Sequence, residues 1–386
     1  MNFDKYDVVI VGAGLAGSTL ARILADSKKK VLIIEKRKHI AGNVYDYFRK
    51  DKLLVQKYGP HIFHTASEKI WEFVNRFSRF FPFQHKVLGL IKGKLVPIPF
   101  NFKSIDTLFD KSKAATLKHL LKSTFPGQWK ISIFDLLSCK NKLLKQLGDY
   151  IYENVFYHYT LKQWDMPPEQ LGKFIIKRIP VILGYQDTYF YDKYQYMPQK
   201  GFTYLFKNML RHKNITIRLN KNIKNIISFK QKKIYFEGKP YNGMFIYTGP
   251  IDELFDYKYG VLPYRSLRFV LNRHNKNYYQ PVATVNFPNN NYYTRITEYK
   301  HFLPKKSQPK NKTIIAKEYP IKYGINQNKS PYYPINNKKN DALYQKYKVL
   351  AESHKIILCG RLAEYKYYTM EATISSAMLL ADKLLK

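Results

Sequence analysis

The chain has 386 residues, enough for two or three domains. Its apolar runs are too short for a transmembrane helix, and its N-terminus, with Asp4 and Asp7, lacks the features of a signal peptide. Cys139 and Cys359 are too few for a disulfide framework or a cysteine zinc site, so we expect a cytoplasmic protein. The net charge of +38 attracts polyanions, anionic membranes and anionic substrates alike, but the lysines are spread along the whole chain without a nucleic-acid-binding motif, so nucleic acid is not the expected partner.

The first predicted element is a dinucleotide-binding unit, "DVVIVGAGLAGSTLARILADSKKKVLIIEKR", which runs from Asp7 to Arg37. Val8 to Val11 form an apolar run typical of a buried parallel strand, and apolar residues with helical spacing follow it. A second apolar run, Val31 to Ile34, ends at Glu35, about where an acid holds a ribose hydroxyl in such units. Between the first strand and the helix lie three glycines, Gly12, Gly14 and Gly17. We expect Gly12 to form a tight turn, Gly14 to let the backbone approach a pyrophosphate, and Gly17 to let helix and strand pack closely.

The order of strand, glycines, helix, strand and acid is the context that the glycine motif requires, so it predicts dinucleotide binding. Because FAD-binding proteins often begin with this unit, its start at residue 7 favours FAD over NAD. A glycine-rich turn in an ordinary α/β protein is the alternative, and it would leave Glu35 without a role.

The rest of the chain alternates between patterns typical of strands and of helices. Residues 82–100 predict short strands, and residues 104–163 carry apolar stripes at helical spacing that predict a helical insertion. Short strands return in residues 214–250 and 265–319, and residues 355–385 predict a strand, a turn and an amphipathic helix. The strand–turn pieces "MFIYTGP" and "IILCGRL" indicate a nucleotide-binding sheet that is assembled from distant segments.

We therefore predict an α/β fold with a discontinuous Rossmann-like FAD-binding domain, an inserted helical domain and an antiparallel β-sheet domain. The expected boundaries are 1–80, 204–250 and 336–386 for the FAD-binding domain, 81–103, 173–203 and 251–335 for the β-sheet domain, and 104–172 for the helical domain, with a substrate lid after it.

Two histidines, His61 and His64, lie close together in "YGPHIFHT". No third or fourth ligand cluster accompanies them, so a metal site is not expected. Hydrogen-bonded core histidines remain the alternative to a functional pair.

Ten segments spread over nearly the whole chain carry a family resemblance: "GAGLAG", "YGPHIFHT", "YTLKQW", "FIIKRIPV", "YTGPID", "YRSLRF", "YTRITE", "KEYP", "PYYPI" and "GRLAEYKYY". In this order and approximate spacing they resemble the UDP-galactopyranose mutase family, flavoenzymes that interconvert UDP-galactopyranose and UDP-galactofuranose. The resemblance implies an isomerase in which N5 of reduced FAD forms a covalent adduct with the anomeric carbon of the sugar. It also implies reduction by NAD(P)H or dithionite, a homodimer, and a product that supplies furanose units for surface polysaccharides such as capsule.

The resemblance further implies two arginine clamps for the diphosphate, Arg178 in "KRIPV" and Arg295 in "YTRIT". A guanidinium suits this task because its planar fork binds phosphate oxygens in pairs and stays charged. Arg178 lies in the Pro167–Leu183 stretch, which is a mobile lid in the family. A solvated surface charge is the alternative for each arginine.

Other positions match the family's cofactor and substrate sites. The FAD site is expected to include the three glycines and Glu35 together with Lys36, Asn43, His61, Arg361 and Met370, with the His61–His64 loop against the isoalloxazine ring. The substrate site is expected to include Tyr159 and Trp164 for the uracil and sugar, and the phenols of Tyr189, Tyr319 and Tyr367 for the diphosphate. Without the motifs, any one of these aromatic residues would more often belong to the hydrophobic core or the surface than to a binding site.

Two residues depart from the family pattern. Ala41 stands where the family usually has glycine, and Thr369 stands where it usually has aspartate. Threonine keeps a hydroxyl but lacks the charge, so the natural sugar is open between UDP-galactose, UDP-N-acetylgalactosamine and a dTDP-6-deoxygalactose. Two rival functions remain: an FAD-dependent oxidoreductase of the amine oxidase type, and a basic binding protein.

Overall fold

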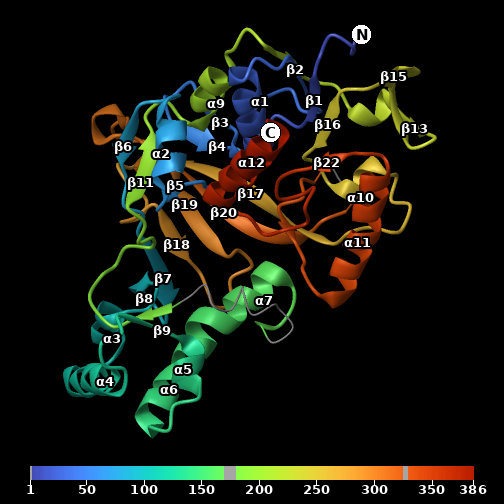
Figure 1. The fold of residues 1–386 in the computed structure, drawn as a ribbon. Coiled ribbons are helices and arrows are strands. Elements are labelled where there is room, and N and C mark those ends of the chain that lie inside the picture. Colours follow the sequence, from blue (N-terminus) through green and yellow to red (C-terminus); the bar gives the residue numbers. More distant parts are fainter. Residues whose placement is uncertain (1, 169–179, 325–328) are drawn as a thin grey trace.

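The computed structural model describes residues 2–168, 180–324 and 329–386 (Figure 1). Arg178 and most of the predicted lid lie outside the described residues. Within the described ranges, no helix is both long and apolar enough to cross a membrane.

A five-stranded parallel sheet forms the nucleotide-binding part of the molecule. Its strands are ordered β12 (Ile215–Arg218), β2 (Val31–Ile34), β1 (Val8–Val11), β16 (Met244–Tyr247) and β22 (Ile357–Leu358). Helices α1 (Leu15–Asp26) and α12 (Met370–Leu384) lie side by side against it (Figure 1). These strands come from three distant stretches of sequence, so the prediction of a discontinuous Rossmann-like sheet is confirmed.

A seven-stranded sheet forms the second layer of the molecule. Its order is β21 (Tyr333–Pro334), β17 (Tyr264–His274), β20 (Thr313–Lys322), β19 (Arg295–Glu298), β18 (Thr284–Asn286), β7 (Val87–Ile91) and β8 (Lys94–Ile98). The neighbours are antiparallel except β7 and β18, which run parallel with Val87 opposite Thr284. The prediction of an antiparallel sheet is therefore wrong for this pair. A long connection between two strands, here residues 92–283, allows them to run in the same direction.

The helical part extends away from both sheets (Figure 1). It contains α3 (Phe102–Leu108), α4 (Lys111–Thr124), α5 (Ile133–Leu137), α6 (Lys142–Ile151), the π-helical turn η2 (Tyr152–Tyr157) and α7 (His158–Trp164). Asn101, Asp110 and Asn141 cap helix N-termini, and one apolar cluster fills the space between the helices. The helical prediction misses β9 (Lys130–Ser132), which pairs with β10 (Pro180–Ile182).

The remaining elements connect these parts. The strands are β3 (Asp46–Phe48), β4 (Leu54–Gln56), β5 (Phe63–Thr65), β6 (Phe80–Pro82), β11 (Tyr194–Pro198), β13 (Ile227–Lys230), β14 (Lys233–Phe236) and β15 (Lys239–Tyr241). The helices are α2 (Glu68–Asn75), α9 (Phe202–Leu210), α10 (Ile251–Leu254) and α11 (Lys338–Ser353), with short turns η1 (Gly42–Val44), η4 (Ile223–Asn225), η5 (Tyr299–Phe302) and η6 (Lys305–Ser307). The domain boundaries expected from the sequence remain a prediction.

Candidate active site

A cavity lies at the carboxyl ends of β1, β2 and β16, where open parallel sheets bind their ligands. Predicted cofactor residues that line it are Gly12, Gly14, Glu35, Lys36, Asn43, His61, Arg361 and Met370. The structure thus brings together all the predicted cofactor residues except Gly17, which lies in the first turn of α1.

The three motif glycines have different structural roles. Gly12 has a φ of +105°, and a Cβ there would lie 2.1 Å from Oγ1 of Thr248. A Cβ on Gly17 would lie 2.0 Å from the carbonyl oxygen of Gly12, so helix and strand could not pack as they do. Gly14 has ordinary extended backbone, and a Cβ there would meet only the Cα of Gly42, at 3.7 Å. The protein's own packing therefore leaves room beside Gly14, which is the space that a bound pyrophosphate needs.

The Glu35 carboxylate holds two loops of this cavity in place. It accepts hydrogen bonds from the backbone N–H groups of Ala13 (2.9 Å) and Arg37 (2.8 Å). Oδ1 of Asn43 accepts one from Nη2 of Arg37 (2.9 Å). Ala41 donates its N–H to the Ala13 carbonyl (2.8 Å) and has a φ of 72°. Because a Cβ disfavours the left-handed region by roughly 1–2 kcal/mol, Ala41 is strained where glycine would not be.

A second cavity lies between the first cavity and the seven-stranded sheet. His61, Arg361 and Met370 line both cavities, so they mark the place where the two meet. Other predicted residues that line the second cavity are His64, Tyr159, Tyr189, Arg295, Tyr367 and Thr369. Trp164 and Tyr319 are not among its lining residues: Trp164 packs behind Tyr333 and Tyr367, and Tyr319 lies under the Arg268 guanidinium.

The two predicted histidines differ in their surroundings. His61 lies at the junction of the cavities, with Nδ1 2.9 Å from the Gly59 carbonyl oxygen. Burial lowers the pKa of His61 to about 4, so the ring is neutral near pH 7. A carbonyl only accepts, so Nδ1 carries the proton and Nε2 keeps its lone pair. His64 is farther from the junction; its Nδ1 contacts Oδ2 of Asp192 (2.7 Å), and its ring stacks on Phe190.

Arg295 presents an unpaired guanidinium edge to the second cavity. Its Nε donates to Oε2 of Glu318 (2.8 Å), whereas neither Nη has a hydrogen-bond partner among the described residues. Burial disfavours the charge, but the Glu318 carboxylate, together with the phenols of Tyr159 and Tyr333, outweighs it, so the pKa of Arg295 is raised. Arg361 is held differently: its Nη1 and Nε donate to the carbonyls of Tyr332 and Tyr368. Of Arg295 and Arg361, the two described arginines that line the second cavity, Arg295 is thus the one whose Nη groups are free for an anion.

The far wall of the second cavity is polar, which the sequence patterns did not reveal. Four buried polar atoms on it have no hydrogen-bond partner within the described structure: Nδ1 of His85, Oγ1 of Thr284, Oδ1 of Asn286 and Oε1 of Glu318. Burial lowers the pKa of His85 to about 3, so its ring is also neutral. Each unsatisfied buried group costs about 1–3 kcal/mol, which a hydroxyl-rich ligand would offset. Asn286, just before "FPNNN", is the one member with a sequence signal, a polar residue at a strand end.

Two family profiles match parts of the chain. A profile of an NAD(P)-binding Rossmann-like domain matches residues 10–77, which confirms the predicted dinucleotide-binding unit. A profile described as UDP-galactopyranose mutase matches residues 154–367, more than half of the chain. The chain belongs to the UDP-galactopyranose mutase family. The prediction of an enzyme of this mutase, or isomerase, type is thereby confirmed.

Two relatives support the family assignment, and two solved structures share the fold. The chain is 36% identical to the UDP-galactopyranose mutase of Mycoplasma genitalium, over 100% of this chain and 96% of that protein. It is 34% identical to the dTDP-fucopyranose mutase of Escherichia coli, over 98% of each. The crystal structure of a reduced UDP-galactopyranose mutase superposes with a TM-score of 0.75 at 15% identity, covering 98% of this chain and 94% of that one. A putative protoporphyrinogen oxidase from Exiguobacterium shares the fold with a TM-score of 0.65 at 13% identity, over 98% of each chain.

Thr369, which we expect to depart from the mutase family pattern, has a structural role as well as a place in the cavity. It is the N-cap of α12, and its side chain accepts the N–H of Ala372 (3.1 Å). Its neighbour Met370 begins the helix at the junction of the two cavities. Aspartate is an equally good N-cap, so either residue fits the backbone here.

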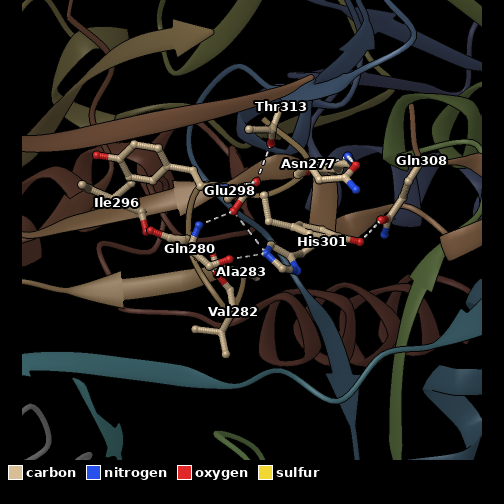
Figure 2. A network of polar contacts seen from close by, with 12 residues as sticks. Asn277, Gln280, Val282, Ala283, Ile296, Glu298, His301, Gln308 and Thr313 are labelled. Carbon is tan, nitrogen blue, oxygen red and sulfur yellow. Dashed lines mark hydrogen bonds and ion pairs between the residues drawn. The ribbon is translucent and has the colours of Figure 1, made fainter. Parts of the chain in front are cut away.

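Strand β19, which begins with Arg295, ends at the fully buried Glu298 (Figure 2). Its carboxylate accepts hydrogen bonds from the backbone N–H groups of Tyr279 and Gln280 (both 2.9 Å), from Oγ1 of Thr313 (2.6 Å) and from Nε2 of His301 (3.2 Å). Burial opposes the charge, but the hydrogen bonds from His301 and Thr313 outweigh it and lower the pKa of Glu298. The network therefore fixes the strand that carries Arg295.

Replacing Glu298 by glutamine should lower the free energy of unfolding by about 2–3 kcal/mol, because an amide cannot accept from all four donors. Since the folded pKa is lowered, the Glu298 contribution is present above the ordinary glutamate pKa and is lost as pH falls through the lowered value. The difference in stability between wild type and Glu298→Gln should therefore shrink on acidification. Urea unfolding at several pH values measures it, with the exposed Glu72→Gln as control. An unchanged stability at neutral pH would contradict the role of this carboxylate.

Proposed function

We propose that the protein is a flavin-dependent nucleotide-sugar mutase that interconverts UDP-galactopyranose and UDP-galactofuranose or a closely related pair. One observation carries the proposal: a dinucleotide cavity and a polar cavity meet at His61, Arg361 and Met370, with the free fork of Arg295 in the polar one. The names of the two relatives support the same reaction type.

The residues of the first cavity fit FAD. The space beside Gly14 and the N-terminus of α1 suit a pyrophosphate, and Glu35 lies at the end of β2 where a ribose hydroxyl would be bound. Reduced FAD, when bound, would supply the nucleophilic N5 that exchange at the anomeric carbon needs. The neutral His61, at the junction of the two cavities, has an unprotonated Nε2.

The second cavity would hold the nucleotide sugar. Arg295 binds the diphosphate as it leaves and returns, and Arg178, outside the described residues, is proposed as its partner. Tyr189 and Tyr367 would donate hydrogen bonds to the same oxygens, and Tyr159 would contact the uracil. His85, Thr284 and Asn286 would satisfy their unpaired atoms on the sugar hydroxyls. Trp164 and Tyr319, which do not line the cavity, are proposed to act only by supporting the residues that do.

Further parts of the proposal rest on the family resemblance: reduction by NAD(P)H, a cytoplasmic location, a homodimer, and furanose units for surface polysaccharides. The rival reading, an amine oxidase-type oxidoreductase, shares the dinucleotide-binding parts.

One assay tests the proposed reaction. Purified protein should contain flavin by its absorbance spectrum, and chromatography of a UDP-galactose incubation should show a new UDP-sugar only with dithionite. Oxygen consumption on addition of an amine would instead favour the oxidoreductase. The mutase proposal would be disproved by a flavin-loaded, dithionite-reduced protein that converts none of UDP-galactose, UDP-N-acetylgalactosamine and dTDP-6-deoxygalactose.

Replacing Thr369 by aspartate should raise the preference for UDP-galactose at least ~10-fold, because a site built to bind a given hydroxyl discriminates strongly against analogues without it. Competition between UDP-galactose, UDP-N-acetylgalactosamine and dTDP-6-deoxygalactose, scored as kcat/KM, measures the change. Thr369→Asn keeps a cap without the charge and is the matched control. Unchanged ratios in the aspartate variant would mean that position 369 does not set the sugar.

A further inference from the structure

The side chain of Lys162, on α7, ends inside a ring of backbone carbonyls. Its Nζ lies 2.6 Å from the carbonyl oxygen of Phe287, 2.7 Å from that of Asn289, 2.9 Å from that of Asn291 and 3.4 Å from that of Tyr293. An ammonium group has three N–H donors and no acceptor. Every second carbonyl of this loop therefore shares the same donor group. Burial lowers the pKa of Lys162 to about 8, which leaves the group charged near neutral pH.

The loop that Lys162 organises connects two site residues. Residues 287–294 run from Asn286, the last residue of β18, to Arg295, the first residue of β19. Both ends line the second cavity. Carbonyl oxygens that converge without a cation repel one another, so the ammonium group stabilises the shape of this loop, together with the hydrogen bond from the Phe287 N–H to the Thr294 carbonyl (2.8 Å). Asn286 and Arg295 are opposite each other in the antiparallel pairing of β18 with β19, so the loop is the turn of this hairpin, and its contact with Lys162 sets where the pair lies relative to α7.

Helix α7 is itself firmly anchored. Arg265 is almost fully buried and donates from Nε to the Gln163 carbonyl (3.0 Å) and from Nη2 to the Lys162 carbonyl (3.3 Å) at the end of the helix. It also pairs with Asp165 (3.4 Å). Tyr159, one turn before Lys162 on the same helix, lines the second cavity. One ammonium therefore joins the helix that carries Tyr159 to the loop that carries Asn286 and Arg295.

We infer that Lys162 is a positioning residue of the active site, which sets Arg295 and Asn286 in register with Tyr159 by organising the carbonyls of residues 287–293. The expected loss of turnover rests on the proposed function, whereas the expected effect on the loop does not depend on it. Lys162 does not line the second cavity and acts through the loop alone.

The test compares Lys162→Ala and Lys162→Met with wild type. Both should lower kcat/KM about 100-fold, since a misplacement of about 1 Å can cost that much, with flavin content unchanged. Hydrogen–deuterium exchange of peptides that cover residues 287–293 should become faster in both. Lys322→Met removes an exposed ammonium that pairs with Asp165 in the same region, and it should change neither quantity.

Rescue by small cations tests whether the ammonium group itself, and not only the bulk of the lysine side chain, is needed at this loop. Lys162→Ala removes Cγ, Cδ, Cε and Nζ and leaves a vacancy the size of propylammonium beside the four carbonyls, so propylammonium chloride should restore kcat/KM at least ~10-fold. Tetramethylammonium chloride, which has no N–H donor, controls for ionic strength, and Lys162→Met fills the space and should not respond.

Three results would overturn the inference: wild-type exchange rates in both variants, kcat/KM within about twofold of wild type, or equal rescue by the two salts. If the alanine variant does not fold, the methionine variant still decides through its exchange rates. Failure of the proposed function would appear in the wild type, as an absence of turnover, and the exchange measurement does not depend on turnover.

Discussion

Replacing Arg295 by alanine is expected to lower kcat/KM at least ~100-fold while flavin remains bound. The expectation follows from the unpaired Nη groups of Arg295 in the second cavity and from the need for a fixed cation as a diphosphate departs. Steady-state kinetics with UDP-galactose under dithionite measure the loss. Arg295→Lys keeps the charge without the planar fork, so its activity should fall between those of alanine and wild type.

Loss of Arg295 also leaves Glu318 buried, with 1% of its surface exposed and no positive partner. Breaking such a pair destabilises a protein by about 3–5 kcal/mol, so the single variant could lose activity by unfolding. The double variant Arg295→Met/Glu318→Gln removes both charges and should regain stability without regaining activity. Normal turnover by that double variant would refute the clamp.

Replacing Gly14 by valine is expected to give protein without FAD. The backbone at Gly14 accepts any residue, and the neighbours leave room for a Cβ, so the chain should still fold. The added side chain would occupy the space that a pyrophosphate needs, next to the N-terminus of α1. Flavin absorbance per protein and the melting temperature measure the two effects separately.

Gly184→Val is the matched control for Gly14→Val, because a Cβ at Gly184 meets nothing within 4 Å and this glycine is not part of the first cavity. It should keep full flavin. Full flavin occupancy in Gly14→Val would show that the cofactor site is misassigned. By contrast, Gly17→Val should unfold the protein outright, because its Cβ would collide with the Gly12 carbonyl.

The sequence by itself determined the elements that depend on local pattern. The apolar runs at Val8–Val11 and Val31–Ile34, the glycine spacing and the helical stripes of residues 104–163 specify strands, a turn and helices, since these follow from side-chain period and backbone freedom. Ordered motifs along the whole chain also sufficed for the family, which the profile and the relatives confirm.

Only the tertiary structure decided which further residues join the predicted ones in the second cavity. Val87 and Thr284 lie far apart in sequence, and their parallel pairing, which the sequence did not predict, brings His85 and Asn286 to one polar wall. Whether a buried polar atom is satisfied depends on its neighbours in space, so the unpaired atoms on that wall have no local signal. The same holds for Lys162, which is one lysine among many in the sequence. Its role appears only where the fold directs four carbonyls at its ammonium group.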